Sequence, residues 1–170
     1  MTANPDDGQQ DFRDFAMARA SQLFRIAYLM SGDWHEAEDL VQSTLTKLFV
    51  AWGRVQRRGS VDTYARRVLV NTYLSQRRLR RSGELPVADI GDARAPSAVD
   101  AALRMTLLAA LRELPARSRA VVILRHIDDQ SVDSVAQLLG TTPAAVKSLN
   151  ARGLSRLREL LGADQSLFFS

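Results

Sequence analysis

The chain has 170 residues, 46% hydrophobic and 25% charged, which is enough to form packed cores in one domain or in two small ones. It contains no cysteine and only two histidines, which excludes disulfides and thiolate chemistry and argues against a histidine-based metal centre or other cofactor site. A polar N-terminal segment and the lack of a long apolar run exclude a signal peptide and membrane insertion, so we expect a cytoplasmic protein.

Two amphipathic helices are predicted in the first third of the chain. Residues 11–30 place apolar side chains at helical spacing, and Gly32 then interrupts the pattern. Asp33, with Glu36 three positions later, resembles a capping box that starts a second helix running to about Arg54. Acidic side chains in its first turns are expected to interact favourably with the positive end of the helix dipole.

A strongly basic segment follows. Nine arginines lie within residues 54–81 against one acid, Asp62, which gives this segment a net charge of +8 although the whole chain carries +4. Residues 54–60 are predicted to form a basic, glycine-containing loop, and residues 61–81 a third helix. Basic segments of this density favour a phosphate backbone as the partner.

The third predicted helix has one apolar side and one basic side. The basic side carries arginines, Asn71, and the side chains of Val70 and Leu74, which we expect to be exposed. A solvated helix usually mixes charges of both signs, and this face does not. Guanidinium groups suited to phosphate, together with an amide able to bond a base edge, therefore indicate a nucleic-acid contact.

The segment after this helix separates two helical regions. Residues 82–100 carry four acids and one arginine and show no helical or strand periodicity over most of their length. Beyond them, residues 99–114 are amphipathic, and Pro115 opens another helix that ends near His126. We therefore predict an all-α protein of two small helical domains (10–82 and 98–162), joined by a flexible acidic linker (83–97) and followed by a tail (163–170).

Residues 131–160 show the pattern of a helix-turn-helix. A short apolar-striped helix ends at Gly140, where a left-handed backbone costs glycine little. Thr142 can cap the next helix, and Pro143 suits its first position. That helix is basic and polar on one side, which favours reading of the DNA major groove, although an ordinary helical hairpin with solvated arginines has the same pattern.

The order of these motifs resembles the small bacterial sigma factors of the extracytoplasmic-function (ECF) group, in particular the short actinobacterial SigE-like type. The resemblance rests on five motifs in order, which together cover nearly the whole chain: AEDLVQ at 37–42, AW…RV at 51–55, YARRVLVNTYLSQRR at 64–78, LRELPARSRAVVILR at 111–125 and the helix-turn-helix. It implies a subunit without enzymatic activity that binds core RNA polymerase and directs promoter recognition and DNA melting. An anti-sigma protein is a candidate further partner.

The resemblance also implies which residues meet each partner. The first domain would read and melt the −10 element, with the basic loop cradling an extruded base, and the second domain would read the −35 element. The −10 contacts would be Arg54, Arg57, Arg58, Arg66, Arg67, Asn71, Arg77 and Arg78. The −35 contacts would be Thr142, Ala144, Lys147, Ser148, Arg152 and Arg156, and the polymerase contacts Asp39, Gln42 and Ser43.

Three residues depart from the common pattern of the family. Ser75 stands where many members have aspartate, and Ala145 and Leu149 replace a threonine and an arginine that are frequent in the recognition helix. Two rival functions remain. A stand-alone helix-turn-helix regulator would bind duplex DNA without polymerase. A helical nuclease would need its acids, which crowd the start of one helix at 33–39, to have a catalytic partner that the sequence does not supply.

Overall fold

The computed structural model describes residues 5–83 and 98–162. Within these two ranges the chain is built from α-helices and contains no β-strand, as predicted. We call residues 5–83 the front half and residues 98–162 the rear half. The predicted linker and the predicted tail fall almost entirely outside the described residues.

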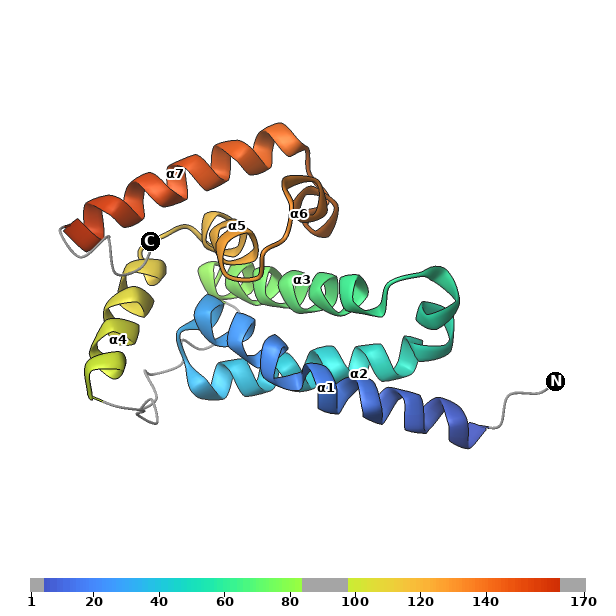
Figure 1. The fold of residues 1–170 in the computed structure, drawn as a ribbon. Helices are drawn as coiled ribbons and strands as arrows, with labels where there is room; N and C mark the ends of the chain where they lie inside the picture. Colours follow the sequence, from blue (N-terminus) through green and yellow to red (C-terminus); the bar gives the residue numbers. More distant parts are fainter. Residues whose placement is uncertain (1–4, 84–97, 163–170) are drawn as a thin grey trace.

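The front half is a three-helix unit formed by α1 (Pro5–Ser31), α2 (Trp34–Arg58) and α3 (Val61–Arg81), in which α2 packs against both of the others (Figure 1). Side chains from the sequence start these helices. The Asp33 carboxylate accepts a hydrogen bond from the Glu36 amide at 2.8 Å, and the Ser60 hydroxyl accepts one from the Thr63 amide. Gly32, with φ +71°, makes the sharp turn between α1 and α2.

Aromatic side chains fill the contact between α1 and α2. Both tryptophans of the chain lie here, each surrounded by rings from α1. Trp52 is 7% exposed and contacts Phe12 and Phe15, whereas Trp34 contacts Phe24 and Tyr28. Edge-on and tilted contacts of this kind add to the stabilisation from burying apolar surface.

The rear half contains α4 (Ala98–Arg112), α5 (Ala116–His126), α6 (Val132–Leu139) and α7 (Pro143–Leu161). The predicted helix-turn-helix is confirmed as a pair of helices, α6 and α7. Gly140 adopts the left-handed conformation at φ 60°, and the Thr142 hydroxyl accepts a hydrogen bond from the Ala145 amide at 3.1 Å. Pro143 occupies the first turn of α7.

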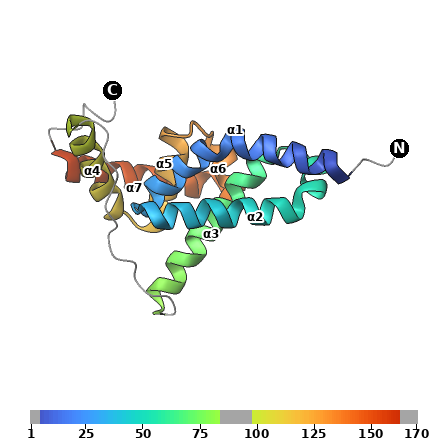
Figure 2. The same cartoon turned by 90° about the horizontal axis from the view of Figure 1, so that it is seen from below.

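The two halves pack against one another along one side of each. In the rear half, α5 contacts α1 and α3, while α6 contacts α3 and α4 contacts α1 (Figure 1). Seen from below, the C-terminal part of α3 projects away from α1 and α2 (Figure 2). Almost all buried apolar residues of both halves belong to one continuous cluster.

Two expectations about the front half were wrong. Residues 54–58 are the last turn of α2 rather than a loop, because Val55 is 5% exposed and continues the apolar stripe of that helix. Val70 and Leu74 were expected to be exposed, but Val70 is completely buried and Leu74 is partly buried against the core. Helical periodicity assigned one buried side to α3, but α3 packs against α2 on one side and against α5 and α6 on another.

Hydropathy gives one further result. Among the described helices, none combines the length and the apolar character needed to cross a membrane.

Candidate nucleic-acid interface

A basic pocket lies where α2 ends and α3 begins. It has a volume of about 440 Å³, and the residues that line it include Arg54, Val55, Arg58, Tyr64 and Arg67. We call this the junction pocket. Gly59, with φ +134°, lets the chain reverse here, and the Ser60 cap starts α3 at once. Three of the predicted −10 arginines therefore surround one pocket, although residues 54–58 are helical rather than looped.

The remaining predicted −10 residues fall into two groups. Asn71 and Arg78 are exposed on α3, and Arg57 is exposed at the end of α2. Arg66 and Arg77 are instead partly buried in contacts inside the molecule. Arg66 binds Asp128 of the rear half, with 2.6 Å between Nε and Oδ2.

Arg77 takes part in a second internal contact, together with Arg80. The Glu36 carboxylate lies 2.9 Å from Arg80 Nη1 and 3.5 Å from Arg77 Nη2, and Arg77 also donates to the Ser31 carbonyl. Glu36 was predicted to act through the helix dipole. The structure shows that its carboxylate is also a buried anion that fixes two arginines of α3 against the start of α2.

The exposed face of α7 carries the predicted −35 residues. All six are exposed: Thr142, Ala144, Lys147, Ser148, Arg152 and Arg156. The opposite face is buried through Val146, Leu157 and Leu161. At Gly153, α7 approaches α5 so closely that an added Cβ would lie 2.7 Å from Val122 Cγ2. Because Gly153 has no side chain, α7 can lie close against α5, and the polar face of α7 remains exposed.

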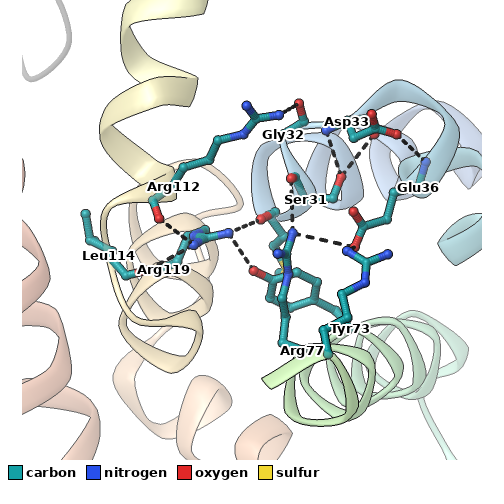
Figure 3. A network of polar contacts seen from close by, with 11 residues as sticks. Ser31, Gly32, Asp33, Glu36, Tyr73, Arg77, Arg112, Leu114 and Arg119 are labelled. Carbon is teal, nitrogen blue, oxygen red and sulfur yellow. Dashed lines mark hydrogen bonds and ion pairs between the residues drawn. The ribbon is translucent and has the colours of Figure 1, made fainter. Parts of the chain in front are cut away.

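Arg119 of α5 is the most buried cation of the described structure, at 5% exposure. Its Nη1 donates to the Met30 carbonyl at 2.7 Å and to Tyr73 Oη at 2.8 Å, and its Nη2 donates to the carbonyls of Arg112 and Leu114 (Figure 3). Arg112 also donates to the Gly32 carbonyl. Burial lowers the pKa of Arg119 from its ordinary value, and burial raises the pKa of Tyr73, with nearby arginines opposing that rise.

A cleft of about 500 Å³ separates the two basic helices, and we call it the interhelical cleft. From α3 it is lined by Asn71, Arg78 and Arg81, and from the rear half by Arg117 and Arg152, among others. Leu149, one of the departures from the family pattern, also faces this cleft. Carboxylates are absent from its lining.

An apolar groove of about 930 Å³ runs between α1 and α2 on a different surface. Phe12, Phe24, Leu45 and Phe49 supply much of its lining, and Phe49 is 49% exposed. We call it the α1–α2 groove. Of the predicted polymerase contacts, Gln42 lines this groove, Asp39 is exposed on α2, and Ser43 is half-buried.

Three of the acidic side chains considered for a nuclease make structural contacts instead. Asp33 caps α2, Glu36 binds two arginines, and Glu38 accepts a hydrogen bond from Trp34 Nε1 at 2.8 Å. Within the described ranges, no group of three histidines, cysteines or acids could hold a metal ion.

Arg119, Tyr73 and Asp128 were not recognised as a set from the sequence. Each pairs with residues distant in the chain: Arg119 with a partner 89 residues away, and Asp128 with one 62 residues away. One local signal was available. Arg119 stands among apolar residues of a predicted core helix, at a position where a charge must find a buried partner.

The two halves match family models separately. Residues 15–83 match Sigma-70 region 2, and residues 104–157 match Sigma-70 region 4. The RNA polymerase sigma-E factor of Streptomyces coelicolor is 32% identical over 154 residues, which cover 90% of this chain and 87% of that protein. The ECF RNA polymerase sigma factor SigM of Mycobacterium tuberculosis is 33% identical over 144 residues, covering 83% and 72%.

Solved structures share the arrangement of helices. The sigma factor RpoE of Bartonella quintana, crystallised with the anti-sigma factor NepR, superposes with a TM-score of 0.77 at 26% identity, covering 91% of this chain and 99% of that one. CnrH, solved with the cytosolic domain of CnrY, superposes with a TM-score of 0.69 at 22% identity over 92% and 90% of the two chains, and so shares the fold. From the two matched regions and these relatives, the chain belongs to the sigma-70 family of RNA polymerase sigma factors, within its ECF group.

Proposed function

We propose that this sigma factor uses three separate surfaces to bring core RNA polymerase to a promoter and to open it. The junction pocket captures a base of the −10 element, the exposed face of α7 reads the −35 element, and the α1–α2 groove binds polymerase. The division into a −10 domain (10–82) and a −35 domain (98–162) follows from this assignment. We further propose that the protein acts in the cytoplasm and catalyses no reaction itself.

The observation that carries the proposal is the lining of the junction pocket. Taking a base out of the stack costs a few kcal/mol, so an opened duplex must be held by contacts that exist only after melting. Arg54, Arg58 and Arg67 converge on the pocket with the Tyr64 ring. Guanidinium groups suit the phosphates, and an aromatic face that stacks on a base contributes about 1–3 kcal/mol. A pocket of about 440 Å³ also lies in the range of small-ligand sites.

Asn71 and Arg78 extend this surface along α3. Both side chains are exposed, and Arg67 lies one turn before Asn71 on the same helix. An amide can bond a base edge, while the flanking arginines fix the strand by its phosphates. We propose that this row follows the −10 strand away from the pocket.

The α1–α2 groove fits a helical partner. Its lining is mainly aromatic and aliphatic but includes Glu38 and Gln42, and Asp39 is exposed on the same helix. An amphipathic helix that carries basic residues beside its apolar stripe would match this surface. We propose that core polymerase supplies it, with Asp39, Gln42 and Ser43 among the contacts. An anti-sigma protein is a further candidate partner, since the related RpoE was crystallised with one.

The face of α7 supports duplex reading in the rear half. Its polar and basic side chains project from a helix whose other side is buried, which is the geometry of a recognition helix in the major groove. We propose that Lys147 and Arg152 contact phosphates and that Ser148 lies near the base edges. Ala145 and Leu149 supply no hydrogen-bonding side chain, so direct readout here rests on few groups.

Transcription with purified core polymerase tests the proposal. The wild-type protein should give promoter-specific transcripts, and Arg67→Ala and Asn71→Ala should each reduce them on a duplex template while leaving binding to core polymerase unchanged. A template with a premelted bubble at the −10 element should restore much of the lost transcription, because the melting step is bypassed. Arg13→Ala removes an exposed arginine of α1 outside these surfaces and serves as the control for lost charge.

Two results would contradict the proposal. If the wild-type protein gave no promoter-specific transcript with core polymerase but bound an operator duplex tightly alone, the stand-alone regulator would be favoured. If the bubble template did not restore transcription by Arg67→Ala, the junction pocket would not act in melting.

A further inference from the structure

Asp128 connects the rear half to the front half through its side chain. It lies in the loop between α5 and α6, and its side chain is 1% exposed. The carboxylate accepts hydrogen bonds from Arg66 Nε at 2.6 Å and from Gln22 Nε2 at 2.9 Å, and both donors belong to the front half. The loop itself is held by backbone groups, since the Asp128 amide donates to the Ile123 carbonyl and the Asp128 carbonyl accepts from Gln130.

The Arg66 guanidinium is therefore a group for which the Asp128 carboxylate and a promoter phosphate would compete. The resemblance to the ECF group assigns its guanidinium to the −10 strand, beside Arg67 of the junction pocket, whereas in this structure its Nε and Nη2 both bind the Asp128 carboxylate. A carboxylate presents two anionic oxygens to the guanidinium fork, much as a phosphate does. The N–H groups of Nε and Nη2 that bind Asp128 are not available to a phosphate at the same time, so the contact with Asp128 competes with a contact with DNA.

We propose that Asp128 is an internal substitute for promoter phosphate, a latch that holds the two halves closed and must release Arg66 before the promoter is bound. This proposal rests on the proposed function, because it assigns a regulatory contact to the same DNA-binding surface.

The closed arrangement also brings part of each DNA-binding face to one cleft. Asn71 and Arg78 of α3 share the interhelical cleft with Arg152 of α7. Its volume of about 500 Å³ is that of a small-molecule pocket and is far too small for a duplex. The −10 and −35 elements are at least one helical turn apart, roughly 34 Å. While α3 and α7 meet at this cleft, their DNA-binding faces cannot contact both elements at once.

Charge in the cleft opposes closure. Five arginines from the two halves line it with no carboxylate among them: Arg77, Arg78, Arg81, Arg117 and Arg152. Like charges across a cleft repel, so the closed state needs compensating contacts elsewhere. Asp128 supplies such a contact on one side of the interface, and Arg119 supplies another through Tyr73 and the Met30 carbonyl. Removing one contact should then shift the balance towards the open state.

Energy transfer within the full chain tests the latch directly. The chain has no cysteine, so Gln56→Cys on α2 and Ser155→Cys on α7, both at exposed positions, can carry a donor and an acceptor dye. The test variant is Asp128→Asn, which removes the charge and keeps the shape. The matched control is Asp129→Asn, which makes the same charge change at the exposed neighbouring residue, whose left-handed backbone at φ 51° suits asparagine well.

Asp128→Asn should raise the ratio of open to closed molecules on the order of tenfold, the effect of losing one hydrogen bond to a charged group. Asp129→Asn should leave the ratio at the wild-type value. The effects of Asp128→Asn and Arg66→Gln should not add in the double variant, because both substitutions act on the same contact. In a titration with promoter duplex, Asp128→Asn should open at a lower DNA concentration than Asp129→Asn.

A second variant tests the closed state independently of Asp128. Tyr73→Phe removes one acceptor of Arg119 and keeps the buried ring, so it should also favour the open state while the helical circular dichroism stays unchanged. If Asp128→Asn and Tyr73→Phe both matched Asp129→Asn in energy transfer, the latch would be refuted even though the wild-type protein directs transcription. If the wild-type protein directed no promoter-specific transcription, the proposed function would fail, and competition with promoter phosphate would fail with it.

Discussion

The two basic helices, α3 and α7, use their positive charge in different ways. On α3, three arginines are engaged inside the molecule: Arg66 with Asp128, and Arg77 and Arg80 with Glu36. On α7, apolar packing around Val146 and Leu157 holds the helix in place and leaves Lys147 and Arg152 at the surface. The number of arginines on a helix therefore overestimates how many can bind nucleic acid when some of them hold the helix in place. On α3, some arginines hold the helix and others are free to bind DNA.

The largest expected effect is a loss of folding stability when Arg119 of the rear half is replaced. It tests whether this arginine serves only to stabilise the fold. Arg119→Ala should lower the free energy of unfolding by about 3 kcal/mol or more, because it leaves several buried carbonyls without a donor and opens a cavity. Chemical denaturation measures the change. Arg117→Ala, two residues earlier and exposed, should change stability by at most about 0.5 kcal/mol. Equal effects of the two substitutions would mean that the Arg119 contacts do not stabilise the fold.

The next effect concerns the anchoring of α3. Glu36→Gln should lower the free energy of unfolding by about 2 kcal/mol, since Arg77 and Arg80 lose their buried anion. Asp39→Asn, three residues later and exposed, should leave stability unchanged and instead weaken binding to core polymerase. Thermal unfolding and co-purification with core polymerase separate the two outcomes. Normal co-purification of Asp39→Asn would leave Asp39 with its role at the helix dipole alone.

A pair of glycines tests the apolar anchoring of α7. Gly153→Ala should destabilise the protein by about 1 kcal/mol, because the new methyl group overlaps Val122 and the helix must shift. Gly53→Ala, within α2 and with nothing within 4 Å of the new Cβ, should stabilise by about 0.5–1 kcal/mol through helix propensity alone. Denaturation midpoints of the two variants should move in opposite directions. A stabilising Gly153→Ala would show that α7 does not depend on its close approach to α5.

The smallest effect concerns the salt dependence of DNA binding. Lys147→Ala should reduce the slope of log affinity against log salt by about 0.9 for promoter DNA bound by the polymerase holoenzyme, as expected for one lost phosphate contact. Arg77→Ala should reduce the slope less, because Arg77 is partly occupied by Glu36 and by Ser31. Binding measured at several salt concentrations gives both values. Equal reductions would remove the distinction drawn between α3 and α7.

Local signals predicted much of the fold. Gly140, Thr142 and Pro143 gave the turn between α6 and α7, and Asp33 gave the start of α2, because each acts on backbone groups within a few residues. The end of α2 was misplaced because Gly59 and the arginines before it resemble a loop, whereas Val55 packs in the core. Val55 continues the apolar stripe of α2, but the glycine and the charges outweighed that periodicity in the prediction.

The candidate site was predicted in part for the same reason. The exposure of the α7 face follows from helical periodicity, since one side of that helix is apolar. The partners of Arg66, Arg77 and Arg119 depend on how distant segments meet, so sequence spacing gave no sign of them. Periodicity also assumes one buried side, and it failed at Val70 because α3 packs on two.

The placement of the two tryptophans has a spectroscopic consequence. Both Trp34 and Trp52 pack against rings of α1 in the front half, so intrinsic tryptophan fluorescence follows the unfolding of that half alone. Circular dichroism follows the helices of both halves. Coincident denaturation curves from the two signals would mean that the halves unfold as one cooperative unit. Curves that separate would report, without any label, how strongly the two halves are coupled.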